Sequence, residues 1–293
     1  MHSKELRKGI ILAGGTGSRL APLTKAISKQ LMPIYDKPMI YYPLSTLLLA
    51  EIKDILVICT PFFLDSYKNL LQDGSQWGIK ISYQTQEKPA GIAEAFILGE
   101  QFLNGSPVCL ILGDNLFYGD DLSLKLKAAN KSEGVSTLFA YQVNDPSRYG
   151  IVEFNKKYKV ISVEEKPLKP ASNYAITGIY FYENSVVEIA KKLEPSKRGE
   201  LEITDINKIL LSKNELNVKL LKRGMAWLDT GTFESLHDAG TFIKTIENRQ
   251  GLKIGCPEEI AYKLEYISKS QLKSLANEYN QSDYGNYLFK LIN

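Results

Sequence analysis

Short apolar runs alternate with amphipathic segments along the first half of the chain. Five runs have the length of buried strands, and they cover residues 9–13, 55–59, 79–83, 108–112 and 136–141. Apolar residues at helical spacing fill most of the gaps, for example over residues 92–103 and 122–131. Strands that alternate with helices predict an α/β fold, with a mainly parallel sheet covered on both faces.

The second half of the chain has a different pattern. Between residues 150 and 182 the apolar segments become shorter and alternate, which predicts extra strands laid over the core as a small β subregion. Residues 232–248 form the clearest amphipathic helix, and the chain is helical again beyond Gly251. We therefore predict a core domain over residues 1–250 and a C-terminal helical segment over residues 251–293 that packs on it.

Charge and hydropathy exclude several classes of protein. The 293 residues include 36 basic and 33 acidic side chains, a balance that argues against a general nucleic-acid binder. No apolar stretch approaches the about 20 residues of a membrane span. Residues 1–5 lead straight into the first strand and leave no room for the apolar core of a signal peptide. We expect a cytoplasmic protein that does not contact the membrane.

The cysteines give no sign of a disulfide framework or a zinc site. Cys59 and Cys109 lie inside apolar strands, where a free thiol behaves as a small buried hydrophobe. Cys256 is the only other cysteine, and the chain has only two histidines.

A glycine-rich loop follows the first predicted strand. Gly14, Gly15 and Gly17 are followed by Arg19, and Lys29 comes ten residues later. Such a loop lets backbone amides approach a polyphosphate, and the cations offset its charge. The loop lacks the lysine of a P-loop, and a leucine replaces the third glycine of the dinucleotide pattern. Both common phosphate motifs are thereby excluded.

The whole stretch from residue 10 to residue 39 resembles the signature of the sugar nucleotidyltransferases. The matching patterns are L-A-G-G-x-G-[ST]-R-L-x-P-x-T, K-Q-L-x-P and Y-D-K-P-M-I-Y-Y-P-L-S. Further matches follow in the family's order: LGDN at 112–115, DPxRYG at 145–150, EEKP at 164–167, RGELEITD at 198–205, AWLDTGT at 226–232, ENRQG at 247–251 and CPEEIA at 256–261. Eight or so motifs in order across almost the whole chain make this resemblance specific.

The resemblance implies a fold and a reaction. The fold is a Rossmann-like three-layer α/β/α sandwich with a mainly parallel mixed sheet. Its nucleotide-binding part covers about residues 1–145 and its sugar-binding part about residues 146–231. The likeness is strongest to members that join dTTP to glucose 1-phosphate. These members release pyrophosphate and make dTDP-glucose, the first step of dTDP-L-rhamnose biosynthesis for cell-surface polysaccharides.

This reaction needs charge stabilisation more than acid–base chemistry. The attacking phosphate oxygen is already mostly ionised at neutral pH, because its second pKa is about 6. Cations and a divalent metal can then offset the charge of the two anions. By the resemblance, Arg19 holds the triphosphate with the loop amides, and Lys29 reaches the α-phosphate. Asp114, which follows an apolar strand, and Asp229 are the expected ligands of Mg²⁺.

The resemblance also assigns the two substrate pockets. Gln30, Gln86 and Gly91 match nucleotide-binding positions, although Ala90 and Glu94 depart from the commoner P-D-G-L-A-Q-A pattern. The glucose and its phosphate are expected to contact Asn115, Tyr149, Gly150, Glu165, Lys166, Tyr180 and Arg198. Lys166 is also a candidate catalytic residue.

Two alternative functions remain open from the sequence. One is the same transfer with UTP or CTP, or with another sugar 1-phosphate. The other is a non-catalytic nucleotide-sugar sensor, although such relatives lose the arginine, lysine or carboxylates that are all present here. The resemblance further suggests a homotetramer that dTDP-rhamnose inhibits at a site between subunits. Gly119 and Arg223 are candidates for that site, where Asp120 and Asp121 depart from the family pattern.

Overall fold

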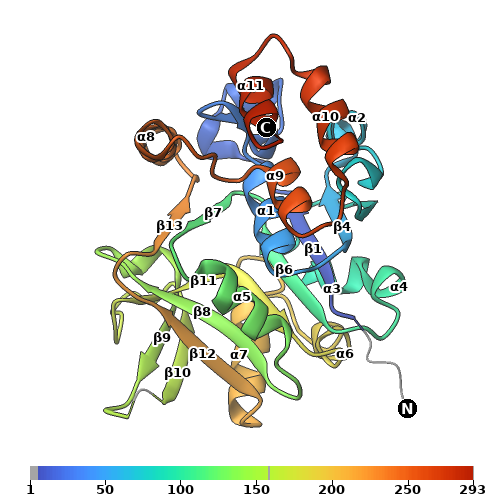
Figure 1. Ribbon diagram of the computed structural model, residues 1–293. Helices are drawn as coiled ribbons and strands as arrows, with labels where there is room; N and C mark the ends of the chain where they lie inside the picture. The colour runs from blue at the N-terminus through green and yellow to red at the C-terminus, as the bar shows by residue number, and fades with distance from the viewer. Residues whose placement is uncertain (1–5, 158, 293) are drawn as a thin grey trace.

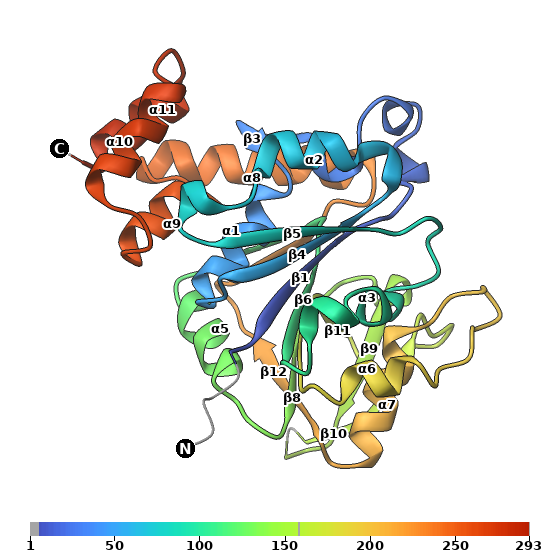
Figure 2. The ribbon, with the colours of Figure 1, turned by 90° about the vertical axis from the view of Figure 1, so that its right-hand side faces the viewer.

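One twisted sheet forms the centre of the molecule (Figures 1 and 2). The computed structural model describes residues 6–157 and 159–292, so the expectation about residues 1–5 lies outside the described residues. Within these ranges the sheet has nine strands in the order β10-β9-β11-β6-β1-β4-β5, and β8 joins β11 to β12. The strands are β1 (Lys8–Ala13), β4 (Asp54–Cys59), β5 (Lys80–Thr85), β6 (Val108–Leu112), β8 (Ser136–Gln142), β9 (Gly150–Phe154), β10 (Val160–Glu165), β11 (Tyr174–Tyr182) and β12 (Leu216–Leu221).

The parallel half of the sheet confirms the apolar runs of the sequence. β6, β1, β4 and β5 are parallel neighbours, with Ile10 opposite both Leu56 and Leu110. Strands buried on both faces read as continuous apolar segments, which is the pattern of β1, β4 and β6. Their carboxyl ends lie at one edge of the sheet, where ligands bind in open α/β folds.

The segment between residues 150 and 182 differs from the prediction in one respect. β9, β10 and β11 do not lie over the core but continue the same sheet in antiparallel directions. β11 makes this possible, because it pairs with both β6 and β8 and its register shifts between Ile176 and Tyr180. The predicted β subregion is therefore an extension of the central sheet.

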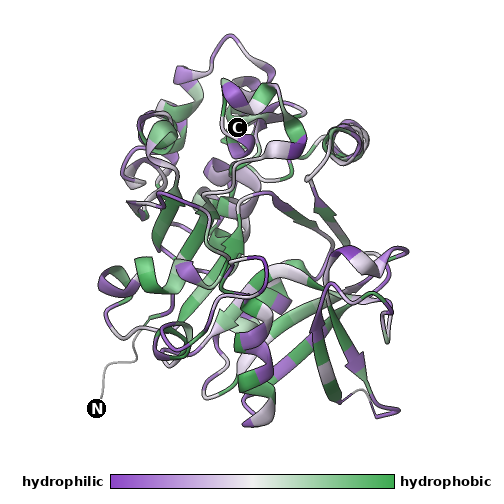
Figure 3. Ribbon diagram, turned by 180° about the vertical axis from the view of Figure 1, so that it is seen from behind, coloured by the Kyte–Doolittle hydropathy of each residue, from purple (hydrophilic) through white to green (hydrophobic). Residues whose placement is uncertain are grey.

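Helices cover both faces of the sheet and complete three layers. Ile11 and Val57 pack with α1 (Tyr41–Leu49), α5 (Leu122–Asn130) and the C-terminal helices α9 (Pro257–Lys263), α10 (Lys269–Glu278) and α11 (Asp283–Lys290). Ile10 and Leu56 face the opposite layer, which contains α3 (Glu94–Leu98), α6 (Val186–Ala190) and α7 (Ile203–Ser212). Figure 2 shows α5 and α7 on opposite sides of the sheet, and Figure 3 shows its apolar strands between more hydrophilic helices.

One predicted helix is interrupted. The segment 92–103 forms α3, which ends at Leu98, and α4 (Glu100–Leu103), and Gly99 separates the two helices. A Cβ at Gly99 would lie 2.9 Å from the Ala95 carbonyl oxygen, so the chain packs there too closely for a side chain.

A second unit lies beside the carboxyl edge of the sheet. The ribbon of β7 (Asn115–Tyr118) and β13 (Ala226–Asp229) leads into the long helix α8 (Phe233–Gln250), as Figure 1 shows. α8 also contacts the small hairpin of β2 (Pro33–Ile34) and β3 (Lys37–Pro38). Their shared apolar cluster includes Ile34, Leu116 and Ile243.

The predicted burial of Cys59 and Cys109 is confirmed. α2 (Leu64–Leu71) follows β4, and Cys59, Cys109 and Cys256 are buried free thiols. A search of the helices in the described ranges found none with the length and apolarity needed to span a membrane.

Candidate functional site

Two carboxylates from distant parts of the chain meet at the edge of the sheet. Asp114 follows β6, and Asp229 is the last residue of β13. The antiparallel β7–β13 ribbon aligns Asp229 with Asn115, the neighbour of Asp114. Thr230, the residue after Asp229, holds the end of β13 against Asp114. Its backbone N–H and its hydroxyl both donate to the Asp114 carbonyl oxygen, at 3.3 and 2.9 Å.

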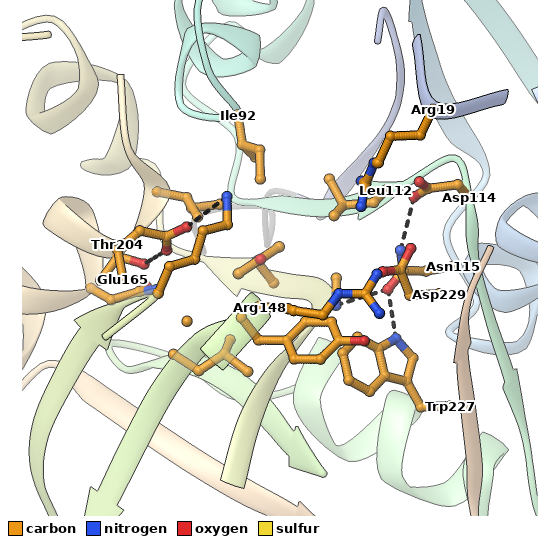
Figure 4. Close-up of a pocket in the computed structure, with 18 residues that line it drawn as sticks. Arg19, Ile92, Leu112, Asp114, Asn115, Arg148, Glu165, Thr204, Trp227 and Asp229 are labelled. Carbon is orange, nitrogen blue, oxygen red and sulfur yellow. Dashed lines mark hydrogen bonds and ion pairs between the residues drawn. The ribbon is translucent and has the colours of Figure 1, made fainter. Parts of the chain in front are cut away.

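The side chain of Asn115 orients this centre. It is only 2% exposed, and its Nδ2 donates to Asp114 Oδ1 at 2.9 Å. Its Oδ1 accepts from the Gly178 amide at 3.1 Å and from Trp227 Nε1 at 2.6 Å (Figure 4). Asn115 thus ties together β7, β11 and β13.

Three cations surround the two carboxylates. The buried Lys29 ammonium forms an ion pair with Asp114 Oδ2. Burial and the neighbouring Asp114 raise the pKa of Asp229, against the opposing influence of Lys29, Arg19 and Arg148. Each of these charges is therefore close enough to affect the Asp229 carboxyl.

A cavity of about 490 Å³ opens beside this charged centre. Nine of the residues predicted as site residues line it: Arg19, Asp114, Asn115, Tyr149, Gly150, Glu165, Lys166, Tyr180 and Asp229. Sequence reasoning assigned no role to the other nine: Ile92, Leu112, Arg148, Ile176, Gly178, Ile203, Thr204, Asn207 and Trp227. Arg148, Thr204 and Trp227 lie inside recognised motifs, which was the available signal for them. Leu112 and Ile203 lie inside such motifs as well, whereas Ile92 and Asn207 do not.

Glu165 and its partners form the opposite wall of the cavity (Figure 4). Glu165 Oε2 accepts a hydrogen bond from the Thr204 hydroxyl at 2.6 Å. Lys166 Nζ lies 3.4 Å from Glu165 Oε1, and the Lys166 backbone N–H donates to the Tyr149 carbonyl at 3.0 Å. This wall combines a carboxylate, a hydroxyl and an ammonium, which suits a polyhydroxylated ligand that carries a phosphate.

Arg198 is the predicted sugar-phosphate residue that does not line the cavity. Its guanidinium bonds both carboxylate oxygens of Glu202 at 2.8 Å, and Nη2 is 3.6 Å from Glu165 Oε1. The side chain is 42% exposed. Arg198 therefore lies behind Glu165 in this conformation.

Of the predicted nucleotide residues, Gly14, Gly15 and Gly17 follow the carboxyl end of β1, and Gln86 follows that of β5. Gly17 has a φ of +60°, which favours glycine, and Gly15 is exposed. Gln30 is buried, and its Oε1 accepts from the Ser28 hydroxyl at 3.0 Å and from the Tyr67 hydroxyl at 3.2 Å.

Gly91 and Gln86 have different surroundings. Gly91 has a φ of +105°, and a Cβ there would lie 2.3 Å from the Leu201 carbonyl oxygen, so the glycine allows close backbone packing. Gln86 follows β5, and its amide oxygen approaches Gly14. Neither residue lines the 490 Å³ cavity.

The donor set at Asp114 and Asp229 fits a magnesium ion that also binds substrate phosphates. No cluster of three or more His, Cys, Asp or Glu side chains suited to a metal occurs in the part of the chain that the structure describes. Mg²⁺ is usually bound through one or two carboxylates, waters and phosphate oxygens rather than by a complete protein cage. Burial and the neighbouring Asp114 carboxylate raise the pKa of Asp229, and both effects would be offset by a bound cation.

Comparison with known sequences gives a consistent result. The family model described as "Nucleotidyl transferase" matches residues 8–246. A glucose-1-phosphate thymidylyltransferase of Neisseria meningitidis serogroup A / serotype 4A is 54% identical over 285 residues, which are 97% of this chain and 99% of the relative. Enzymes of the same name from Xanthomonas campestris pv. campestris and Mycolicibacterium smegmatis are 54% and 52% identical over 97% of this chain, and the matches cover 97% and 99% of those relatives.

Solved structures agree with the sequence comparison. A Bacillus anthracis protein assigned as a glucose-1-phosphate thymidylyltransferase, in complex with sucrose, superposes with a TM-score of 0.75. It is 39% identical, and the match covers 80% of this chain and 94% of that one. A UDP-glucose pyrophosphorylase complexed with UDP-glucose gives a TM-score of 0.72 at 25% identity, over 82% of this chain and 99% of that chain.

Proposed function

The chain belongs to the nucleotidyl transferase family, and from that premise we propose that it transfers a thymidylyl group from dTTP to α-D-glucose 1-phosphate. The products are dTDP-glucose and pyrophosphate. The observation that carries the proposal is the pair Asp114 and Asp229, surrounded by cations at one end of a cavity whose other wall is lined by Glu165 and Lys166.

The residues of this site suit a direct displacement between two anions. The sugar-phosphate oxygen attacks the α-phosphorus, and no protein base is required because the phosphate is already ionised. Arg19 holds the triphosphate, Lys29 offsets the charge that develops at the α-phosphate, and Lys166 holds the sugar phosphate. A divalent cation bound at Asp114 and Asp229 supplies further charge neutralisation. The glucose ring is held by Tyr149, Gly150, Glu165 and Tyr180.

A substrate matrix tests the reaction. Four nucleoside triphosphates are combined with several sugar 1-phosphates in the presence of Mg²⁺, and the products are identified by mass. We expect dTTP with glucose 1-phosphate to give the highest kcat/KM and to release pyrophosphate. No pyrophosphate release from any pair at saturating concentrations would refute the proposed activity.

A charge-removal variant tests the metal assignment. Asp114→Asn is expected to lower kcat by about 100-fold or more, because one electrostatic contact is removed from the transition state. Asp238→Asn, at an exposed position of α8, is the matched control and should retain activity. Near-normal activity of Asp114→Asn at limiting Mg²⁺ would exclude Asp114 as a metal ligand.

We further propose that the product enters dTDP-L-rhamnose synthesis and that dTDP-rhamnose inhibits a homotetramer. A separate cavity of about 280 Å³ is the candidate for this second site, because Gly119 lines it. Arg223 lines a different cavity, so the two candidate residues for the second site do not share one cavity within this chain. Light scattering should give the mass of four chains. Rates that stay unchanged at dTDP-rhamnose concentrations well above those of the substrates would refute the feedback.

A further inference from the structure

Arg148 lines the 490 Å³ cavity and extends toward Asp229 (Figure 4). It is the last residue of the short 3₁₀ helix Pro146–Arg148, which the Asp145 side chain caps by accepting from the Ser147 backbone N–H at 3.3 Å. The guanidinium carbon of Arg148 lies 5.9 Å from the centre of the neighbouring aromatic ring, that of Tyr149. A capped turn and an aromatic ring therefore support the arginine beside the cavity.

The charge of Arg148 is available to a ligand. Lys166, on the same cavity, lies 3.4 Å from Glu165 Oε1. In the described part of the chain, by contrast, Arg148 forms no ion pair and its guanidinium donates no hydrogen bond. A guanidinium carries five N–H donors, and those of Arg148 are not used by the protein. Its charge opposes the rise in the pKa of Asp229, so its field reaches the carboxylate pair.

Arg148 and Lys166 are carried by the same end of one hairpin. β9 begins at Gly150 and β10 ends at Glu165, and these two residues are paired. Arg148 precedes β9 by two positions, and Lys166 follows β10 directly. The Lys166 backbone N–H donates to the Tyr149 carbonyl oxygen at 3.0 Å, which extends the pairing beyond the strands. The hairpin thus presents a guanidinium and an ammonium to one cavity.

We propose that Arg148 is a further catalytic residue, which binds the phosphate of the sugar 1-phosphate together with Lys166 and holds it beside Asp229. The inference rests on the proposed function. A guanidinium can form two parallel hydrogen bonds to one phosphate group, and a lysine ammonium acts as a point charge. The two side chains can therefore bind the same phosphate in different ways.

The contribution of Arg148 is orientation and charge. In the transfer, an oxygen of the sugar phosphate forms a bond to the α-phosphorus of the nucleotide. The bond from that phosphorus to the bridging oxygen of the leaving pyrophosphate breaks. Arg148 gives and takes no proton in this step. It holds the attacking phosphate in place and offsets its charge as the two anions approach each other.

The first test is Arg148→Gln, which removes the charge and keeps a polar side chain. We expect kcat/KM for glucose 1-phosphate to fall about 100-fold, because one electrostatic contact is lost from the transition state. The KM for dTTP should stay within about twofold, since Arg148 lies on the hairpin with Glu165 and not on the glycine loop with Arg19. A fall in kcat/KM of less than about threefold, or equal rises in the KM values of both substrates, would overturn the proposal.

Further variants separate a phosphate contact from a structural role. Arg148→Lys keeps the charge and loses the paired hydrogen bonds, so its kcat/KM should fall about tenfold. Arg249→Gln, at the exposed end of α8, is the matched control and should leave the kinetic constants unchanged. Added methylguanidinium should restore part of the activity of Arg148→Ala. No recovery in an Arg148→Ala protein that has the wild-type free energy of unfolding would contradict the contact.

Calorimetric binding of glucose 1-phosphate separates this inference from the proposed function. If the wild-type protein makes no product with any nucleotide but binds glucose 1-phosphate, the proposed activity fails. Binding that is then about tenfold weaker in Arg148→Gln supports the phosphate contact, and unchanged binding refutes it. If the wild-type protein is active and Arg148→Gln is equally active, only the role of Arg148 is refuted. A wild-type protein that neither reacts with nor binds glucose 1-phosphate would overturn both.

Discussion

At the scale of single residues, Glu258 is a carboxyl group with no exposed surface. It lies at the start of α9, and its Oε2 accepts from the Tyr284 hydroxyl at 2.5 Å. Its Oε1 has no hydrogen-bond partner among the described residues. Burial raises the pKa of Glu258 from 4.5 and outweighs the opposing effect of the Tyr284 hydrogen bond.

This pKa shift predicts a pH-dependent stability. The pKa of Glu258 is higher in the folded protein than in the unfolded chain. Its contribution to the free energy of unfolding is therefore fully present below the unfolded pKa of about 4.5 and is lost as the pH rises through the folded pKa. The glutamine of Glu258→Gln cannot ionise. The free energy of unfolding of this variant should therefore increase relative to that of the wild type as the pH rises above about 4.5. The gain is at most about 1.4 kcal/mol per pH unit.

Urea unfolding between pH 4 and pH 8 measures this difference. Glu278→Gln, at an exposed position of α10, serves as the control and should follow the wild-type profile. Parallel profiles for wild type and Glu258→Gln would show that Glu258 binds its proton equally in the folded and unfolded chain.

The sequence motifs identified many residues of the candidate site. The hydrogen-bond partners of those residues could not be predicted from the sequence. Asp114, Asp229 and Arg19 were predicted and line one cavity. Asn115 was predicted to contact the sugar phosphate, which stays a prediction, and the structure adds that its amide bonds Asp114, Gly178 and Trp227. Those bonds join three strands, so no local pattern contains them.

At the scale of elements, α8 has a complete N-terminal cap. The Thr232 hydroxyl accepts from the Ser235 backbone N–H at 3.2 Å, and the Ser235 hydroxyl accepts from the Thr232 N–H at 3.0 Å. This reciprocal pair satisfies two amides that would otherwise have no partner at the helix start. The cap begins three residues after Asp229, so it also fixes the exit of β13.

Removal of this cap should destabilise the protein. Thr232→Ala is expected to lower the free energy of unfolding by about 1 kcal/mol. Thr245→Ala, at an exposed interior position of the same helix, should be neutral or raise it by roughly 0.5 kcal/mol, because alanine is the better helix former. Urea denaturation compares the two variants. Equal effects would assign the loss to the threonine side chain in general and not to the cap.

The length and periodicity of elements determined which of them could be predicted. The parallel strands and α8 are long enough for their apolar periods to be read. β7 and β13 have only four residues each, and their pairing joins segments more than a hundred positions apart. At Gly99, where residues 92–103 divide, an ideal Cβ would also lie 3.0 Å from Ile10 Cδ1, and a helical period does not contain that tertiary contact.

At the scale of the whole molecule, a charge network attaches the β2–β3 hairpin to α8 and the C-terminal segment. Lys37 Nζ lies 2.9 Å from Glu247 Oε1, with only 2% and 4% of the two side chains exposed. Lys253 lies 2.9 Å from the other oxygen of Glu247 and also pairs with Asp36. The Ile254 backbone N–H donates to Glu247 Oε1 at 2.8 Å.

A double-mutant cycle should reveal strong coupling in this network. Lys37→Met or Glu247→Gln alone is expected to cost about 1.5–3 kcal/mol, because each removes one buried hydrogen bond between charged groups while Asp36 or Lys253 still pairs with the charge that remains. The double variant should cost clearly less than the sum of the two. Unfolding free energies measure the cycle, and the exposed pair Lys208 and Asp205 provides a control expected below about 1 kcal/mol. Additive effects at Lys37 and Glu247 would contradict the coupling.

The β7–β13 ribbon has a consequence for the order in which the protein becomes functional. Asp114 and Asp229 are 115 positions apart, since 229 − 114 = 115, and one short pairing holds them together. At synthesis rates of about 5–20 residues per second, roughly 6 to 23 s separate the two residues as the chain is made. During that interval the residues of the glycine loop and of the parallel strands have been synthesised, but Asp229 has not. A chain that terminates before β13 therefore contains Asp114 without Asp229, and it also lacks α9, α10 and α11, which pack on one face of the sheet.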